Sequence, residues 1–280
     1  MKMTCREFAF AADGGELLYG REWRPASKPL GVVLLVHGLG EHCGRYEFVA
    51  EKLSQAGYGL LAFDLRGHGK SLGRRGHISA YEILLADLDG FIKEAGKRFP
   101  NLPAFLYGHS MGGNLVLNYV LRRQPPLAGG IATSPWLWLA KEPPGFVKIL
   151  LRFLAKLWPT LSIPNGLDVK ALCHDQKVVK AYQEDPLVHN RISLSLLMEI
   201  DKAANWAMAN AEGFGMPLLL MHGGSDGITS PEATQQFAFQ VAKDCTFKLW
   251  PGLFHELHNE PEKEEVLTYL INWLQNRETN

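Results

Sequence analysis

Short, nearly uninterrupted apolar runs recur along this sequence, and between them apolar residues return every three or four positions. The segments VVLLV at 32–36 and PLLLM at 217–221 are two such runs. A strand covered on both faces carries an unbroken apolar run, whereas a strand with one solvated face alternates apolar and polar residues. The pattern therefore predicts an α/β fold with a mostly parallel central sheet that is flanked by helices.

The periodicities place the expected elements along the chain. Residues 16–24 alternate with a period of two, which is typical of an antiparallel strand. Further strands are expected at 32–36, 58–63, 104–107, 127–133, 217–221 and 246–250, and helices at 46–56, 80–98, 112–123, 231–241 and 263–275. Right-handed crossovers would put functional side chains on loops at the carboxyl ends of the strands.

Between residues 135 and 215 the alternation of strands and helices stops. The segment contains prolines, tryptophans and several helical patterns, but no clear strand. We therefore expect a core made of residues 1–134 and 216–280, interrupted by a helical cap insertion at 135–215.

The charge balance and the cysteines narrow the class of protein. The 280 residues include 29 basic and 29 acidic ones, and this net charge of zero argues against a nucleic-acid partner, which needs a basic face. No apolar stretch reaches the roughly 18 residues of a membrane span, and the first residues lack the apolar core of a signal peptide. The four cysteines show no framework spacing, so we expect free thiols and a cytoplasmic protein.

The segment GHSMG at 108–112 places a serine between two glycines, after an apolar strand and before a helix. Glycines two positions before and after Ser110 let the strand and the helix approach closely around one strained residue. The hydroxyl of Ser110 would then project above the sheet beside a helix N-terminus. This context predicts a nucleophile, and the alternative is a tight turn that merely uses small residues.

A serine hydroxyl is a weak nucleophile at neutral pH, so it needs a general base and a group that orients the base. Asp226 and His255 each follow a predicted strand, and the chain order Ser110, Asp226, His255 is that of the α/β hydrolases. Asp226 could also be only a turn former, and His255 only a packing residue. His258 is the rival base, but His255 is favoured because it lies nearer the strand end.

The carbonyl that the nucleophile attacks becomes an oxyanion, which needs hydrogen-bond donors already in place. One donor should be the backbone N–H of Met111, the residue after the predicted nucleophile. The other should come from the glycine-rich loop after the strand at 32–36, where the natural donor is the N–H of Leu39. The alternative for this loop is a glycine-rich turn without a ligand.

Three patterns that would indicate a cofactor or a metal are incomplete. GHGKS at 67–71 ends like a phosphate-binding loop, but Asp64 stands where that motif requires glycine. The glycines at 38, 40 and 44 miss the dinucleotide-binding spacing by one residue, and HELH at 255–258 lacks the HExxH form. We therefore expect no cofactor and no metal.

Five segments occur along the chain in the order VHGLGEH, FDLRGHGKS, GHSMGG, GGSDGIT and PGLFHELHNE. Together they resemble the monoacylglycerol lipase and lysophospholipase branch of the α/β-hydrolase superfamily, and the resemblance covers nearly the whole chain. EDPLV at 184–188 also looks like a segment of that family's insertion. The resemblance implies the same nucleophile, base, orienting carboxylate and oxyanion donors as those assigned above.

The resemblance also implies an activity on lipid monoesters. We expect a carboxylic ester hydrolase that releases a fatty acid from a monoacylglycerol or a lysophospholipid through an acyl-enzyme. The alternative is a general carboxylesterase, thioesterase or acyltransferase with the same catalytic triad of Ser110, Asp226 and His255. A non-catalytic binding protein of this fold would lack at least one of these three residues. The insertion departs from the family's sequence, so acyl chain length and head group stay open.

The insertion contains one segment, FVKILLRFLAKLW at 146–158, in which every residue is apolar or cationic. Lys148, Arg152 and Lys156 recur every four residues and form one stripe of the expected helix. Such a helix could rest on an anionic membrane surface, which would make the protein peripheral to a membrane. It could equally pack between the cap and the core, with its basic stripe solvated.

Apolar residues in or near the insertion are candidates for lining an acyl pocket, because ligand pockets are mostly apolar and aromatic. They are Trp136, Trp138, Phe146, Leu150 and Trp206. The alternative is that they form the core of the cap.

Overall fold

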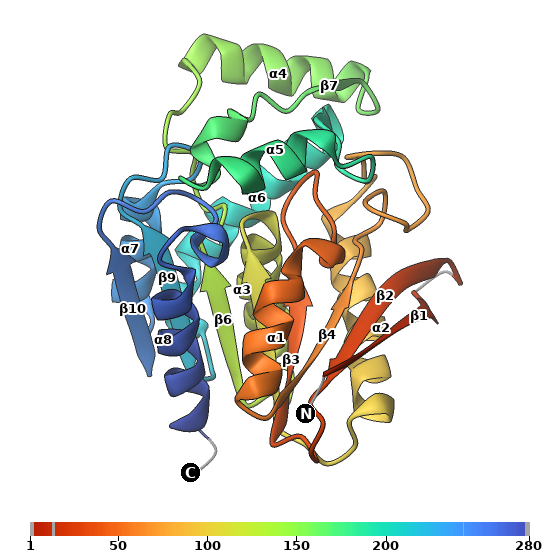
Figure 1. Ribbon diagram of the computed structural model, residues 1–280. Helices are drawn as coiled ribbons and strands as arrows, with labels where there is room; N and C mark the ends of the chain where they lie inside the picture. The colour runs from red at the N-terminus through yellow and green to blue at the C-terminus, as the bar shows by residue number, and fades with distance from the viewer. Residues whose placement is uncertain (1–2, 13–14, 243, 278–280) are drawn as a thin grey trace.

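One eight-stranded sheet organises the molecule (Figure 1). The computed structural model describes residues 3–12, 15–242 and 244–277, so the outermost residues of the two predicted core segments lie outside the described ones. The strands follow each other across the sheet in the order β1-β2-β4-β3-β5-β6-β9-β10. Their bounds are β1 Thr4–Ala11, β2 Leu17–Arg24, β3 Gly31–Val36, β4 Tyr58–Phe63, β5 Ala104–His109, β6 Gly129–Thr133, β9 Leu218–Gly223 and β10 Cys245–Trp250.

Most strand pairs in this sheet are parallel. The six strands from β4 to β10 pair in parallel, while β1 pairs antiparallel with β2, and β2 pairs antiparallel with β4. The mostly parallel sheet that the apolar runs predict is therefore confirmed. The sequence prediction omits β1, because most of its side chains are exposed at the edge of the sheet and its sequence carries little apolar signal.

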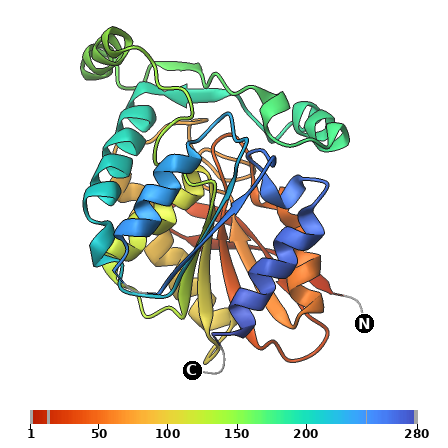
Figure 2. The same ribbon diagram turned by 90° about the vertical axis from the view of Figure 1, so that its left-hand side faces the viewer.

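Helices cover both faces of the sheet, as Figures 1 and 2 show. On one face lie α1 (Glu47–Gln55) and α8 (Lys263–Gln275), and on the other lie α2 (Tyr81–Arg98), α3 (Met111–Arg123) and α7 (Pro231–Gln240). The start of α7 is encoded locally, because proline occupies its first position and the preceding serine accepts a hydrogen bond from a backbone N–H in its first turn.

Strand β3 shows why its sequence is an unbroken apolar run. The residues at 32, 34 and 36 pack into the core beneath α2 and α3, while those at 33 and 35 pack into the core beneath α1 and α8. All five side chains are almost completely buried. Removing each such side chain from water stabilises the fold by about 1.5–3 kcal/mol.

The insertion leaves the sheet after β6 and returns to it at β9, and these two strands are neighbours. It lies over the carboxyl ends of the strands (Figures 1 and 2). Its elements are α4 Gly145–Leu157, β7 Ser162–Pro164, α5 Gln176–Glu184, β8 Arg191–Ser193 and α6 Leu194–Ala209.

Short 3₁₀ turns lie in both the core and the insertion. They are η1 Cys43–Tyr46, η2 Val169–Ala171, η3 Ala211–Gly213 and η4 Leu257–Asn259.

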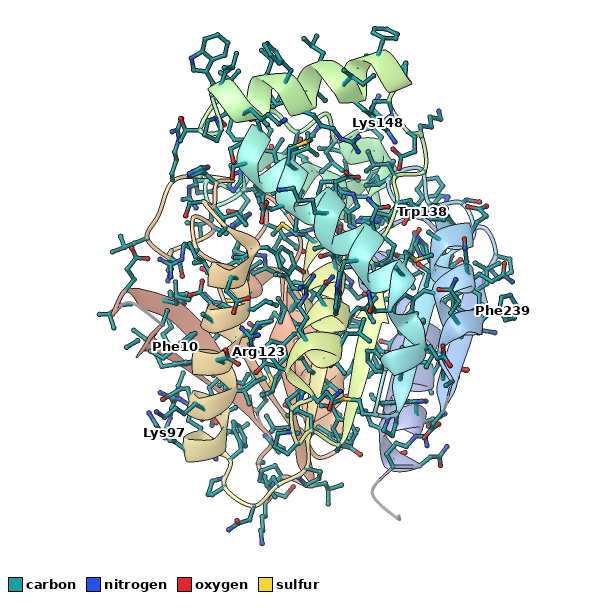
Figure 3. All side chains as sticks on the ribbon, turned by 180° about the vertical axis from the view of Figure 1, so that it is seen from behind. Phe10, Lys97, Arg123, Trp138, Lys148 and Phe239 are labelled. Atoms are coloured by element: carbon teal, nitrogen blue, oxygen red, sulfur yellow. The ribbon has the colours of Figure 1, made fainter. Side chains whose placement is uncertain are left out.

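Two details of the insertion differ from the sequence prediction. Strands β7 and β8 form a small antiparallel ladder, although the sequence predicts no strand there, because three residues are too few to show a period of two. Helix α6 packs against α2 and α3 (Figure 3), so the last helix of the insertion contributes to the main core. Helix α6 thus joins the insertion to the main core, while Leu197 in its first half also lines the cavity at the strand ends.

Candidate active site

Ser110 lies at the tight junction between β5 and α3. Its backbone has φ 54° and ψ −117°, a positive-φ conformation that is strained for a residue with a side chain. A Cβ atom on Gly108 would overlap the carbonyl oxygen of Gly112, and one on Gly112 would overlap that of Val36. The two glycines therefore allow the close approach of strand and helix that the sequence predicts around Ser110.

Ser110 borders a cavity of about 540 Å³ between the strand ends and the insertion. The core side of this cavity includes Gly38, Leu39, His109, Ser110, Thr229 and His255. The insertion side is mainly apolar and includes Trp136, Leu139, Ile163, Leu167, Leu172 and Leu197. A cavity of this size, with an apolar wall and a few polar groups at one side, suits a small ligand with a long apolar part.

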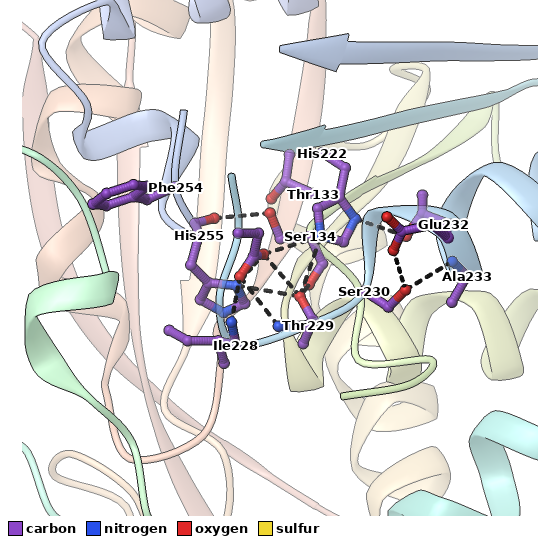
Figure 4. A network of polar contacts seen from close by, with 12 residues as sticks. Thr133, Ser134, His222, Ile228, Thr229, Ser230, Glu232, Ala233, Phe254 and His255 are labelled. Carbon is purple, nitrogen blue, oxygen red and sulfur yellow. Dashed lines mark hydrogen bonds and ion pairs between the residues drawn. The ribbon is translucent and has the colours of Figure 1, made fainter. Parts of the chain in front are cut away.

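His255 lines this cavity and is hydrogen-bonded to Asp226. Figure 4 shows His255 within the surrounding network of polar contacts. Nδ1 of His255 lies 2.7 Å from Oδ2 of Asp226. The other carboxylate oxygen accepts hydrogen bonds from the backbone N–H groups of Ile228 at 2.8 Å and Thr229 at 3.1 Å. Because an ionised carboxylate can only accept, Nδ1 of His255 carries a proton and its Nε2 is left to act as a base.

The surroundings shift the pKa values of this pair in opposite directions. Burial alone would lower the pKa of His255, but the charge and hydrogen bond of Asp226 outweigh burial and raise this pKa above its ordinary value of 6.5. Burial alone would raise the pKa of Asp226, but the neighbouring histidines hold it far below its ordinary range. The pair is therefore built to stabilise an imidazolium beside a permanent carboxylate.

His258, the rival base, packs against Tyr46. Its ring stacks on Tyr46 with 4.7 Å between the centroids, and within the described part of the chain neither of its ring nitrogens has a hydrogen-bond partner. Burial lowers the pKa of His258 to about 4. The geometry therefore favours His255, which contacts Asp226 directly.

The predicted oxyanion donors occupy two neighbouring chain segments. Leu39 lines the cavity, and Met111 is the first residue of α3, so its N–H has no partner within the helix. The loop that carries Leu39 is fixed by Glu41, because Oε1 of Glu41 accepts a hydrogen bond of 2.7 Å from the backbone N–H of Gly38. A rigid loop of this kind can present an N–H donor to an oxyanion without rearrangement.

Glu41 also belongs to a buried charge network that the sequence prediction missed. Arg45 binds Glu41 and donates from both terminal nitrogens to the carboxylate of Glu256, at 2.6 and 2.7 Å. Since Glu256 follows His255, this network joins the loop after β3 to the loop that carries the base. The spacing of Glu41 and Arg45 could have revealed their pairing, whereas their contact with Glu256 depends on tertiary structure.

Two further residues beside the histidine–carboxylate pair were also missed. The hydroxyl of Thr229 donates to Oδ2 of Asp226 at 2.9 Å, and Nε2 of His222 lies 3.0 Å from the same oxygen. His222 directly follows the strand predicted at 217–221. Its place at the carboxyl end of that strand is the signal that could have singled it out.

The five residues predicted to line an acyl pocket lie in three different places. Trp136 is in the cavity wall, whereas Trp138 lines a separate, smaller cavity. Phe146 and Leu150 are 74% and 53% exposed on α4, and Trp206 stacks against an arginine of α3. The last four therefore lie outside the wall assigned to them. For Phe146 and Leu150 the reason is that a helix that is apolar on most sides does not reveal which side faces the protein.

Residues 27–262 match the family described as serine aminopeptidase, S33. The chain belongs to this family. A monoacylglycerol lipase from Mycolicibacterium smegmatis is 33% identical over 273 residues, which cover 97% of each chain. The crystal structure of a monoacylglycerol lipase from Paleococcus ferrophilus has a TM-score of 0.83 and 37% identity, and the match covers 99% of this chain and 100% of that one.

A longer relative shares the same unit within a larger protein. An uncharacterized abhydrolase domain-containing protein from Dictyostelium discoideum is 40% identical over 268 residues, which are 95% of this chain and 28% of that protein. Together with the sheet order, these similarities confirm the α/β-hydrolase fold and the resemblance that the five sequence segments carry.

Proposed function

We propose that this protein is a serine ester hydrolase that cleaves lipid monoesters, foremost monoacylglycerol, into a fatty acid and glycerol. The observation that carries the proposal is a strained Ser110 that shares one largely apolar cavity with His255, whose ring is hydrogen-bonded to Asp226. The similarity to two monoacylglycerol lipases over nearly the whole chain supports the choice of substrate.

The proposed reaction follows from the roles of these groups. Oγ of Ser110 attacks the ester carbonyl while Nε2 of His255 takes its proton, and Asp226 orients the ring and stabilises the imidazolium. The backbone N–H groups of Leu39 and Met111 bind the oxyanion. His255 then gives its proton to the departing glycerol, and a water molecule repeats the sequence on the acyl-enzyme to release the fatty acid.

The first test is hydrolysis of monoacylglycerols of increasing chain length by the wild type and by Ser110→Ala. We expect a maximum at medium or long chains, and a loss of at least ~10³-fold in kcat for the variant, because the nucleophile is removed. Ser27→Ala removes an exposed serine that does not line the cavity and is the matched control.

Different results in this experiment would redirect the proposal. If only short p-nitrophenyl esters turn over, still dependent on Ser110, the protein is a general carboxylesterase. A preference for thioesters would identify a thioesterase, and acyl transfer to an added alcohol would identify an acyltransferase, each with the same triad. Rates that are unchanged in Ser110→Ala would exclude the serine mechanism.

The pH dependence tests the base separately. His255 can accept a proton only when its ring is neutral, so activity is lost as the pH falls through the pKa of this residue in the folded protein. Because Asp226 raises that pKa, we expect the acid limb of kcat/KM to have its midpoint above 6.5. A midpoint at or below this value would contradict the proposed pairing.

We also propose that α4 brings the protein to membrane surfaces that contain its substrate. The helix lies at the outer end of the molecule (Figure 1) and none of its residues is buried. Its exposed apolar side chains, with the tryptophan that follows it, are Phe146, Ile149, Leu150, Phe153, Leu157 and Trp158. Such a face can enter the boundary between head groups and acyl chains of a lipid layer.

Flotation with vesicles of neutral and anionic phospholipid tests this proposal. We expect the double variant Ile149→Ser/Phe153→Ser to lose most of the vesicle-bound fraction, because it removes apolar area from the exposed face. Phe239→Ser is the matched control, since Phe239 is 80% exposed but lies on α7. Equal binding by the wild type and the double variant would exclude α4 as the contact.

The proposed location is the cytoplasm, with contact to membranes through α4. None of the helices within the described ranges combines the length and the apolar character needed to span a bilayer. The four cysteines at 5, 43, 173 and 245 are unpaired, which supports a reducing compartment.

A further inference from the structure

A second histidine contacts the carboxylate that orients His255. His222 lies at the carboxyl end of β9 and its side chain is completely buried. Its Nε2 atom is 3.0 Å from Oδ2 of Asp226, and its Nδ1 atom is 2.8 Å from the hydroxyl of Thr234 in α7. The ring therefore bridges the carboxylate of Asp226 and a helix of the main core. Figure 4 shows His222 within this network.

The two oxygens of Asp226 are held in different ways. Oδ1 accepts two hydrogen bonds from backbone N–H groups of its own loop, those of Ile228 and Thr229. Oδ2 is the oxygen that is hydrogen-bonded to His255, and it also accepts hydrogen bonds from the hydroxyl of Thr229 and from Nε2 of His222. Of these three contacts to Oδ2, the one from His222 comes from strand β9. Thr229 belongs to the same loop as Asp226, and His255 belongs to the loop after β10.

The contact with Asp226 fixes which nitrogen of His222 donates to the carboxylate. An ionised carboxylate has no proton to donate, so the nitrogen that faces Asp226 must carry one. The other nitrogen, Nδ1, lies 2.8 Å from the hydroxyl of Thr234, which can donate a hydrogen bond to it. His222 thus presents a fixed donor to the same oxygen as the catalytic base.

We propose that His222 is a positioning residue that holds Oδ2 of Asp226 in the orientation His255 requires and shares the charge of that oxygen. The inference rests on the proposed serine hydrolase function. It assigns His222 no contact with the substrate.

Removal of His222 should change the pH profile in a defined direction. Without the second donor, more of the carboxylate charge acts on His255, so the pKa of His255 rises and the acid limb of activity moves to higher pH. The other titratable groups that face His255 come from four segments and stay unchanged in the variant. They are Glu41, His109, Asp226, Glu256 and His258.

The experiment compares wild type, His222→Leu and His222→Gln. The readouts are kcat and KM for a monoacylglycerol from pH 5 to 9, and the pH dependence of labelling by a fluorophosphonate probe, which reacts with an activated serine. We expect His222→Leu to lower kcat by ~10- to 100-fold at similar KM and to move the acid limb up by about 0.5 to 1 pH unit. His222→Gln should regain most of the rate, because its amide can donate to Asp226 and accept from Thr234.

Two controls separate positioning from a general loss of structure. His68→Leu removes another buried histidine, whose Nδ1 contacts the backbone oxygen of Arg66, and should leave the acid limb in place. Thr234→Val nearly conserves volume but removes the partner of Nδ1, and should shift the limb in the same direction by a smaller amount. It provides the test if His222→Leu does not fold.

The outcomes for the two proposals are distinguishable. If the wild type is not labelled by the probe, or if Ser110→Ala labels equally, the proposed function fails. If the wild type is labelled at Ser110 but folded His222→Leu, or Thr234→Val in its place, keeps the wild-type rate and midpoint, the role of His222 is overturned.

Discussion

Two helices of the same insertion, α4 and α6, have opposite relations to the rest of the molecule. Helix α4 has no buried residue, although its sequence is almost entirely apolar or cationic. Helix α6 contains charged and polar residues, yet eight of its side chains are buried, because it packs on α2 and α3. Apolar content alone therefore does not predict burial, since a partner surface must also be present.

The largest expected effect is a difference in the free energy of unfolding between matched variants of the two helices. Ile200 of α6 is completely buried, whereas Ile149 of α4 is 68% exposed. We expect Ile200→Ala to lower the free energy of unfolding by about 2–5 kcal/mol, because it leaves a cavity. Ile149→Ala should change it by less than about 0.5 kcal/mol. Urea denaturation of both variants measures the difference, and comparable losses would mean that α4 is packed in solution.

A smaller effect is expected where α6 caps a core helix. The first backbone N–H of α2 donates to Oε2 of Glu199 at 3.0 Å, and the residue at the N-cap of α2 provides no side-chain hydrogen bond. A negative charge at this end of a helix is stabilising, so Glu199→Gln should cost about 0.5–1 kcal/mol near neutral pH. Glu212→Gln removes an exposed carboxylate in η3 and serves as the control.

The pH dependence of this loss has a definite sign. Burial alone would raise the pKa of Glu199, but hydrogen bonds from Lys202 and from the backbone of Tyr81 outweigh it and lower this pKa below 4.5. The stabilisation is therefore present above pH 4.5 and is lost as the pH falls through the lowered value. Denaturation curves of wild type and Glu199→Gln should converge as the pH falls below 4.5 and Glu199 becomes protonated, and a constant difference would rule out the charge as the cause.

The smallest effect concerns the direct tie between the two helices. Arg152 of α4 and Asp201 of α6 form an ion pair of 3.5 Å, with side chains that are 59% and 40% exposed. Exposed pairs contribute little, so Asp201→Asn should lower the free energy of unfolding by less than about 0.5 kcal/mol. A loss of about 2 kcal/mol or more would show that this pair, rather than apolar packing, holds α4 on the cap.

Much of the core could be predicted because its central strands are buried on both faces. The run at 58–63 coincides with β4, and that at 32–36 lies within β3. The edge strand β1 and the short pair β7 and β8 could not be predicted, since their residues are exposed or too few to show a period. These elements depend on neighbours in space, which the local sequence does not specify.

The same limit applies to the site. Ser110, Asp226 and His255 were expected from their positions after strands, and parallel strands bring such positions to one edge of the sheet. Glu256 and His222 could not be predicted, because their roles arise from contacts between different loops and strands at that edge. The outward direction of Phe146 and Leu150 could not be foreseen either, since α4 is apolar on most of its surface and its sequence marks no inward face.

The adjacency of β6 and β9 has an evolutionary consequence. The chain leaves one strand and returns to its neighbour, and α6 remains packed on the core. A single recombination event that exchanges the segment 135–193 would therefore keep every strand of the main sheet together with the three predicted triad residues. Substrate preference could change in one genetic step while the reaction chemistry is inherited intact.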